Sequence, residues 1–334
     1  MFYDGTKLLN TKDLNKNTPE IFICVSNRSA GKTTYFCKAM VNAFLERGEQ
    51  FFVLVRTKNE VKSGGLKFYS VFDGLFFQEN TFSTVKIDGD NVHAITIDNK
   101  ICGFVGALNA ADKIKPISNI FSRVNTIFFD EFQSEHYLPN EIEKFQSIHT
   151  SIARGGGKQS RYVKCILCSN YLSVLNPYFT ALKISERVNP QAKFIRGNGW
   201  VLEQNTNTSA ETARQNSVFN RAFGFEHDSR EYALDNNDLI GNASGNSRYL
   251  FTIVSEKQEY GVYAFENFYY VSDRVDKKAP KIACGYGDIA PNVMHKNTQS
   301  TTISWLKACF CNGNMKFKNH ACKNATLVLL SSCR

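Results

Sequence analysis

Short, nearly continuous apolar runs recur along the first half of the chain, and each of them ends in polar residues. They lie within Ile21–Val25, Val124–Phe132 and Tyr162–Asn170. Runs of this length are typical of strands that are buried on both faces of a parallel sheet. The stretch that follows the first run, Thr34–Arg47, is predicted to be a helix. This pattern predicts an α/β fold around a mostly parallel sheet.

A different pattern fills the second half. Arg248–Asp273 holds three apolar, aromatic-rich runs divided by polar pairs, which is typical of an antiparallel meander. The region from Phe194 to Asp238 is polar with scattered apolar positions, and it is predicted to be a helical lid or linker. We therefore expect a first domain at 1–195, a linker at 196–238 and a smaller α+β domain at 239–334.

The loop between the first strand and its helix, Ser26–Thr33, reads SNRSAGKT. A strand, a loop ending in Gly-Lys-Thr and a helix follow one another in the order of a phosphate-binding P-loop. Loop N–H groups would stabilise the phosphate oxygens of ATP, Lys32 would reach the β and γ phosphates, and Thr33 would place its hydroxyl on Mg²⁺. The residues expected to hold the nucleotide are Ser26, Asn27, Arg28, Ser29, Ala30, Gly31, Lys32, Thr33 and Thr34.

One position departs from the strict motif, because Ser26 stands where the loop usually opens with glycine. Serine lacks the freedom of glycine at positive φ, but a strand-end residue in ordinary extended geometry does not need that freedom. The alternative is an apolar strand that runs into a helix with an idle lysine.

Paired carboxylates follow the strand within Val124–Phe132. Asp130 is expected to hold Mg²⁺ through its water shell, and Glu131 to polarise the water that attacks the γ-phosphate. The alternative is a solvated acidic turn. The separation from the loop leaves room for an intervening strand, which fits the additional-strand class of P-loop ATPases. The tandem acids favour water as the acceptor over the small molecule of a phosphotransferase.

Two further polar features fit the same reading. Asn170 stands at the tip of the next strand, where it can contact the γ-phosphate and report its loss, although Ser-Asn is also common in plain turns. Arg154 precedes three glycines, and a glycine-rich loop can present an arginine finger to a neighbouring subunit's nucleotide. An ordinary surface loop is the alternative there.

Composition narrows the class of protein. With 334 residues, 43% hydrophobic and 13% aromatic, the chain is globular and long enough for two domains. Its net charge of +9 suits contact with a polyanion, or simply solubility. No run of eighteen apolar residues and no signal peptide is present, so we expect no membrane span, a cytosolic location and reduced cysteines.

Four cysteines crowd the end of the chain around His320. Their spacing is not one of the usual structural-zinc patterns, so buried reduced thiols are favoured over a zinc site. The four are Cys309, Cys311, Cys322 and Cys333.

With these residues assembled, the chain resembles the DNA-packaging ATPases of small tailed phages of the phi-twenty-nine type, compact relatives of the large terminase motors. The resemblance is carried by Arg47–Glu60, by the stretch Thr126–Glu141 with TIFFDEF and YLPNE, and by Cys165–Phe179. Weaker counterparts are Asp238–Asn242 and Ala308–Phe317, so the resemblance spans most of the chain in order.

The resemblance implies a homomeric ring, of five subunits, that hydrolyses ATP to drive double-stranded DNA into a procapsid. It implies work at the portal vertex on a structural packaging RNA, in the host cytoplasm. It also implies residue roles: a loop arginine at Arg28, the P-loop pair Lys32 and Thr33, the acids Asp130 and Glu131, the trans-acting finger Arg154, a trans-acting lysine at Lys115 or Lys113, and a DNA-facing lysine at Lys58.

Terminase motors carry a ribonuclease-H-like nuclease in their second half. Here Glu256, Glu266 and Asp273 cannot be assembled into a two-metal site, so we expect a vestigial nuclease-like domain that binds DNA or the packaging RNA. Its aromatic residues pack in a core or stack on bases, and core packing is favoured. A non-catalytic nucleic-acid-binding module with a relic P-loop is the alternative to the motor. Backbone contacts are expected from Arg274, Lys277, Lys278, Lys281, Lys316, Lys318 and Lys323.

Overall fold

The computed structural model divides the chain into two units, each described by itself. The first unit comprises Met1–Leu182 with Val188–Leu234, and the second Lys183–Arg187 with Asp235–Arg334. In the part of the chain that the structure describes, no helix is both long and apolar enough to cross a membrane. The described residues are 3–27, 29–70, 75–134, 137–154, 159–174, 176–185, 187–188, 192–205, 212, 216–218, 222 and 239–330.

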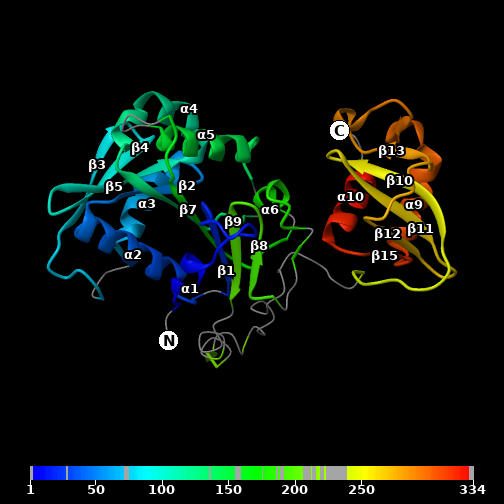
Figure 1. Cartoon of the computed structure of the whole chain (residues 1–334), viewed down its shortest axis with the longest axis horizontal. Helices are drawn as coiled ribbons and strands as arrows, with labels where there is room; N and C mark the ends of the chain where they lie inside the picture. The colour runs from blue at the N-terminus through cyan, green and yellow to red at the C-terminus, as the bar shows by residue number, and fades with distance from the viewer. Residues whose placement is uncertain are drawn as a thin grey trace. The chain divides into compact units, whose positions relative to one another are not determined.

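A nine-stranded sheet forms the centre of the first unit, in the order β3-β4-β5-β2-β6-β7-β1-β9-β8 (Figure 1). Six neighbouring strands, β5, β2, β6, β7, β1 and β9, are mutually parallel, and β5 also belongs to the antiparallel meander β3–β4–β5 at one edge. The strands are β1 (Ile21–Ser26), β2 (Gln50–Val55), β3 (Phe82–Asp88), β4 (Val92–Ile97), β5 (Lys100–Ala107), β6 (Val124–Asp130), β7 (Lys164–Asn170), β8 (Phe194–Arg196) and β9 (Trp200–Asn205).

Helices cover both faces of this sheet, with α2 and α3 on one side and α4 and α5 on the other (Figure 1). Successive residues of β2 show why its apolar run is continuous. Phe51 stacks on Phe68 of α3 at 4.9 Å between ring centroids, and Phe52 meets Phe121 on the opposite face at 5.4 Å. The helices are α1 (Thr6–Asn10), α2 (Lys32–Arg47), α3 (Lys58–Ser70), α4 (Ala111–Ile114), α5 (Glu141–Ala153) and α6 (Pro177–Ala181), with the 3₁₀ turns η1 (Leu108–Ala110) and η2 (Lys115–Phe121).

The predicted α/β class and additional strand are confirmed, with one change in where that strand comes from. The strand inserted between β1 and β6 is β7, which follows the acids in sequence instead of preceding them. The expected boundary at residue 195 is also wrong for this sheet, because β8 and β9 continue it to Asn205. The buried Glu203 interrupts the apolar pattern of β9, and Tyr3 satisfies it with a hydroxyl bond of 2.6 Å. Most of the expected helical lid lies outside the described residues.

The second unit holds a six-stranded sheet in the order β14-β13-β10-β11-β12-β15. The predicted meander is confirmed as β10–β11–β12, and β13 and β14 then run parallel to β10, the arrangement of a ribonuclease-H-like sheet with β15 added at the edge. The elements are β10 (Arg248–Ser255), β11 (Gln258–Ala264), β12 (Tyr269–Ser272), β13 (Lys281–Ala283), β14 (Val293–His295), β15 (Met315–Phe317), α9 (Ser300–Cys311), α10 (His320–Leu330), η3 (Tyr286–Asp288) and η4 (Lys296–Thr298).

One face of this second sheet packs against α9 and α10. Phe251, Val262 and Val271 form a core with Cys309 and Cys322 from the helices. Burial raises the pKa of Cys322 to about 12, so its thiol stays protonated at neutral pH. The expectation of buried thiols is confirmed for these two cysteines. The side chain of Cys311, and Cys333, lie outside the described residues.

Candidate nucleotide-binding site

Three parallel strands bring the predicted polar residues to one edge of the first sheet. Ser26 at the end of β1 is in register with Asn170 at the end of β7, and Asp130 at the end of β6 is in register with Cys168. Because neighbouring parallel strands end on the same side, the loop, the acid and the asparagine meet next to the first turn of α2. Ligands of open α/β sheets bind at this edge.

The loop itself has the geometry of an anion-binding turn. Gly31 has a φ of 92° and Ser29 a φ of 62°, and both turn the backbone before α2 begins at Lys32. The backbone N–H of Tyr3 donates to Ala30 O at 2.9 Å and ties the N-terminal segment to this turn. Arg28 lies outside the described residues.

Serine is compatible with the first loop position because that residue is still part of the strand. Ser26 pairs with Asn170 on one side and with Asn205 on the other, and it is fully buried. A residue in a strand has negative φ, so glycine is not required there.

Lys32 is held inside the loop by oxygen atoms. Its ammonium donates to Ser26 Oγ at 2.8 Å, to Asn27 O at 3.3 Å and to Asn170 Oδ1 at 3.3 Å, and the side chain is buried. The shortest of these contacts is therefore the one to the Ser26 hydroxyl, which a glycine at this position would lack. Asn170 thus lies beside the P-loop lysine, and its role as a γ-phosphate sensor stays a prediction.

The hydroxyl of Thr33 donates to Asp130 Oδ2 at 2.7 Å. Burial raises the pKa of the Asp130 carboxyl; the Thr33 hydrogen bond lowers it, nearby Glu131 raises it further and Lys32 acts to lower it. A hydroxyl and a poorly solvated carboxylate in direct contact are hard oxygen donors of the kind that Mg²⁺ prefers. These two side chains therefore fit the magnesium site that the sequence predicts.

Glu131 follows in a strained backbone conformation. Its φ is 56°, a region that glutamate rarely occupies, and its N–H donates to Asp130 Oδ1 at 3.1 Å. The side chain is exposed. Strain of this kind is retained where surrounding contacts fix it, often at functional sites.

Those fixing contacts come from a buried ion pair that sequence reasoning missed. The guanidinium of Arg56, just after β2, donates to Glu131 O at 3.4 Å and to Phe132 O at 2.7 Å. It also pairs with Glu141 at 3.2 Å, whose side chain is 1% exposed and accepts the hydroxyl of Tyr178 at 2.9 Å. A charged residue directly after an apolar strand was the available signal for Arg56.

Gln133 holds the same loop from the other side. Its Oε1 accepts the backbone N–H groups of Leu172 at 3.2 Å and Ser173 at 3.0 Å, just beyond Asn170. Gln133 is buried, and its Nε2 has no hydrogen-bond partner among the described residues. The loop that carries Glu131 is thus joined to the segment that carries Asn170. No pattern in the sequence pointed to this residue.

A cavity of about 540 Å³ opens beside the two carboxylates, between α2, α3 and the ends of β2 and β6. It reaches both Asp130 and Glu131, so water has access to the acids from this side. The lining residues include Thr33, Cys37, Arg56, Glu60, Ser63, Phe68, Asp130 and Glu131.

Three predicted residues do not join this cluster within one chain. Lys58 begins α3, Lys115 is exposed at the start of η2, and Arg154 is exposed directly after α5. Within the described part of the chain, none of these three side chains forms a hydrogen bond or ion pair with the P-loop. Arg161 closes the base of the loop after Arg154, because its N–H donates to Ala153 O at 3.0 Å. The glycines of that loop and Lys158 lie outside the described residues.

Strand order and site together define a P-loop protein of the additional-strand class. The sequence profile of the family described as Podovirus DNA encapsidation protein (Gp16) matches residues 1–334. The chain therefore belongs to the Podovirus Gp16 DNA encapsidation family.

Individual relatives agree with this membership. The DNA packaging protein of Bacillus phage phi29 is 26% identical over 353 aligned positions, which cover 100% of this chain and 98% of the relative. A chain of the bacteriophage Phi-29 viral genome packaging motor assembly has a TM-score of 0.72 at 23% identity, over 98% of both chains. The N-terminal domain of the DNA packaging ATPase from bacteriophage phi29 has a TM-score of 0.50 at 26% identity, over 61% of this chain and 96% of that one.

Proposed function

We propose that this protein is the ATP-hydrolysing subunit of a phage DNA-packaging motor, and that it drives double-stranded DNA into a procapsid. The observation that carries the proposal is the assembly of Lys32, the Thr33–Asp130 pair and the exposed Glu131 at one sheet edge. It occurs in a chain of the DNA encapsidation family.

Each side chain of this cluster has a distinct task in hydrolysis. Lys32 would exchange its loop oxygens for the β and γ phosphates. Thr33 and Asp130 would hold Mg²⁺, which would neutralise developing charge on the phosphates. Glu131 orients and polarises the attacking water. Asn170 contacts Lys32 and loses or gains that contact as the γ-phosphate leaves.

Ring formation accounts for the predicted residues that stand apart from the site. Arg154 is exposed on a loop whose base is fixed, a suitable place from which to enter a neighbouring subunit's site as an arginine finger. Lys115 or Lys113, both exposed, would likewise reach the nucleotide of the neighbouring subunit. We propose a homomeric ring, of five subunits, at the portal. The similarity to a chain of the Phi-29 packaging motor assembly supports an oligomeric assembly.

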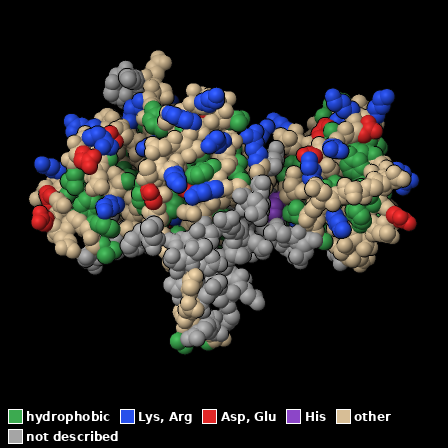
Figure 2. Space-filling view, turned by 60° about the horizontal axis from the view of Figure 1, so that its bottom comes forward, with side chains coloured by type: hydrophobic (Ala, Val, Ile, Leu, Met, Phe, Trp, Pro, Cys, Tyr) green, Lys and Arg blue, Asp and Glu red, His purple; other side chains and the backbone are tan. Residues whose placement is uncertain are grey.

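Charge supports a nucleic-acid partner. The chain carries +9, and Figure 2 shows more lysine and arginine than acidic side chains on the visible face of each unit. We propose phosphate-directed, salt-sensitive contacts with double-stranded DNA, including one from Lys58, and contacts of the second unit with DNA or a structural packaging RNA. The site of action would be the host cytoplasm, at the portal vertex.

The test is steady-state ATP hydrolysis with and without double-stranded DNA. Glu131→Gln is expected to lower the rate on the order of 10²–10⁴-fold while nucleotide binding is retained. Glu143→Gln, an exposed acid on α5, is the matched control and should not change the rate. Normal hydrolysis by Glu131→Gln would contradict the assignment. Nucleotide binding without hydrolysis by the wild-type chain, even with portal and packaging RNA present, would favour a non-catalytic nucleic-acid-binding module.

A further inference from the structure

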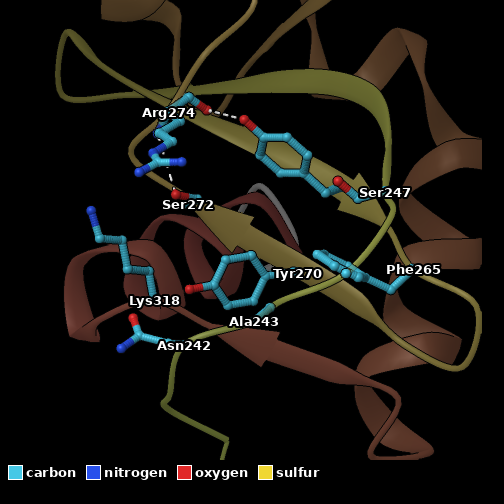
Figure 3. Close-up of a pocket in the computed structure, with 10 residues that line it drawn as sticks. Asn242, Ala243, Ser247, Phe265, Tyr270, Ser272, Arg274 and Lys318 are labelled. Atoms are coloured by element: carbon cyan, nitrogen blue, oxygen red, sulfur yellow. Dashed lines mark hydrogen bonds between the residues drawn. The ribbon is translucent and has the colours of Figure 1, made fainter.

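A second cavity, of about 330 Å³, lies on the sheet face of the second unit that α9 and α10 leave uncovered (Figure 3). Side chains alternate along each strand, so Val262 and Val271 enter the core while Tyr263 and Tyr270 face the cavity. The lining residues are Asn242, Ala243, Gly245, Ser247, Tyr263, Phe265, Tyr270, Ser272, Arg274 and Lys318.

The wall of this cavity is built from the segment that leads into β10. Ile240 bridges to Phe317 of β15, and the N–H of Gly241 donates to Phe317 O at 2.9 Å. The hydroxyl of Tyr270 donates to Gly241 O at 3.1 Å. From there Asn242 to Ser247 passes over the sheet face (Figure 3). Backbone and side-chain hydrogen bonds therefore fix the wall of the cavity.

One end of the cavity is cationic. Figure 3 shows Arg274, Ser272 and Lys318 gathered there, with the hydroxyl of Tyr270 turned toward them. The backbone of Arg274 is fixed, because its carbonyl accepts the hydroxyl of Tyr263 at 3.0 Å and its N–H donates to Ser272 Oγ at 3.3 Å. Its guanidinium forms no ion pair or hydrogen bond within the described residues.

Lys318 is held in place as well, by two bonds of 2.6 Å to Asp273. The fixed lysine and the unpaired guanidinium thus flank two hydroxyl groups. The hydroxyls of Ser272 and Tyr270 already donate to Asp273 Oδ1 and Gly241 O, so the donors open to a ligand are those of the guanidinium and the ammonium. A planar guanidinium with an ammonium near it matches the oxygens of a phosphate group.

The other end is aromatic. Phe265 stacks on Phe268 with centroids 4.8 Å apart and planes 4° from parallel, and it meets the edge of Tyr270 at 6.0 Å. The ammonium of Lys316 lies 4.7 Å from the centre of the Phe268 ring. A rigid pair of flat rings beside a phosphate-sized cationic end is a platform for one nucleobase.

We propose that this cavity binds one nucleoside phosphate unit, with the base against Phe265 and the phosphate between Arg274 and Lys318. A paired duplex keeps its bases inside the helix, so the unit comes from an unpaired strand or from a free nucleotide. The site works without the P-loop and would act whether or not the first unit hydrolyses ATP.

Full-length protein without added nucleotide is titrated into a fluorescent single-stranded hexauridylate, and the same titration with Lys32→Ala, which impairs the P-loop, should give the same affinity. Arg274→Ala and Phe265→Leu are each expected to weaken binding about tenfold or more. The matched controls are Lys307→Ala and Trp305→Leu, a lysine and an aromatic residue on α9, outside the lining. Arg274→Lys, which keeps the charge but not the fork, should fall between wild type and Arg274→Ala.

Equal losses in the α9 controls, or no loss in the cavity variants, would overturn the proposal. So would a duplex of the same length that binds as tightly as the single strand and depends on the same two residues. Uridine monophosphate separates the two sources: its own binding, lost in Arg274→Ala, identifies a free nucleotide, and binding of the hexamer alone identifies an unpaired strand. Unchanged melting temperature in Arg274→Ala shows that folding is intact. ATP hydrolysis is measured in parallel and should be unchanged, so a failed ATPase leaves this test standing.

Discussion

The two sheets of this protein use polar residues in different places. In the first unit, the polar side chains stand at the ends of parallel strands, where Ser26, Asp130 and Asn170 meet the first turn of α2. In the second unit, they lie on the open face of the sheet, among aromatic rings. The ends of neighbouring parallel strands bring a few polar side chains to one small site, whereas the face of a sheet presents side chains over a wider surface. The first arrangement suits chemistry on a phosphate, and the second suits recognition.

The acids of the second unit make the contrast sharper. Glu256 lies in the β10–β11 turn and Asp273 after β12, at one end of the sheet, while Glu266 lies in the β11–β12 turn at the other end. Asp273 also forms an ion pair with Lys318. These three carboxylates therefore do not converge. Among the described residues no group of acids, histidines and cysteines is placed to hold a metal ion. That the unit lacks nuclease activity stays a prediction.

The largest expected effect concerns the buried ion pair of the first unit. Glu141→Ala leaves the Arg56 guanidinium without its carboxylate in a buried place, so it should lower the free energy of unfolding by about 3–5 kcal/mol. Denaturant unfolding measures this, with Glu143→Ala on the same helix as the control. A loss below about 1 kcal/mol would mean that this pair behaves like a surface pair. It would then contribute no more than the partly exposed Lys318–Asp273 pair of the second unit.

Gln133→Leu should have the next largest effect. It leaves the N–H groups of Leu172 and Ser173 without their acceptor, at a cost of about 1–3 kcal/mol in the free energy of unfolding. Because these bonds join the Glu131 loop to the Asn170 segment, ATP turnover should fall while nucleotide affinity changes little. Gln133→Glu, which keeps the acceptor oxygens, should recover part of the turnover. Loss of stability with normal turnover would reduce Gln133 to a packing role.

Asp130→Asn should act in opposite directions on stability and function. Burial raises the pKa of Asp130, so the folded chain binds this proton more tightly than the unfolded chain does. The stability that this difference contributes is present below the ordinary carboxyl pKa and is lost as the pH rises through the folded pKa. At neutral pH the neutral amide should therefore raise the melting temperature of the nucleotide-free protein by about 2–4 °C.

The gain should vanish at low pH, where Asp130 is protonated and resembles the amide. Nucleotide with Mg²⁺ should no longer stabilise the variant. Thermal unfolding as a function of pH, with and without ADP and Mg²⁺, follows both effects. A gain that persists unchanged at acid pH would show that ionisation of Asp130 is not its cause.

Asp273→Asn gives the smallest effect and completes the comparison. The Lys318–Asp273 pair is partly exposed, so its loss should cost less than about 1 kcal/mol. The change also frees Lys318 beside the cavity, and hexauridylate binding should tighten by a few fold at low salt. Weaker binding in Asp273→Asn would mean that the acid positions Lys318 more than it neutralises it.

Much of the nucleotide site could be predicted because its residues are close in sequence or end an apolar run. The P-loop, the acids Asp130 and Glu131, and Asn170 each lie next to such a run. The structure brings Lys32 to Ser26 and Asn170, and Thr33 to Asp130. The supports of that site could not be predicted in the same way. Arg56 meets Glu141 across 85 positions, and Gln133 meets Ser173 across 40. Arg56 carries one local signal, a charge directly after an apolar strand, but nothing local marks Gln133 or the two distant partners.

The expected boundary at 195 fails for a related reason. The strand β9 ends in Glu203 and Gln204, so its sequence resembles a polar linker. Glu203 is buried because Tyr3, 200 positions away, donates a hydrogen bond to it. The roles of Arg154, Lys115 and Lys58 remain predictions. The first two would act on a neighbouring subunit and Lys58 on DNA, and neither partner belongs to this chain.

The sequence by itself determined the class of the first unit, the P-loop motif, the acids beside it and the meander of the second unit. These depend on local order and on hydrophobic period, which the chain carries without folding. Only the tertiary structure decided that β7 is the inserted strand, that Ser26 is held in extended geometry by two neighbours, and that a cationic and an aromatic end share one cavity. Those features require contacts between distant residues, and packing alone brings such residues together.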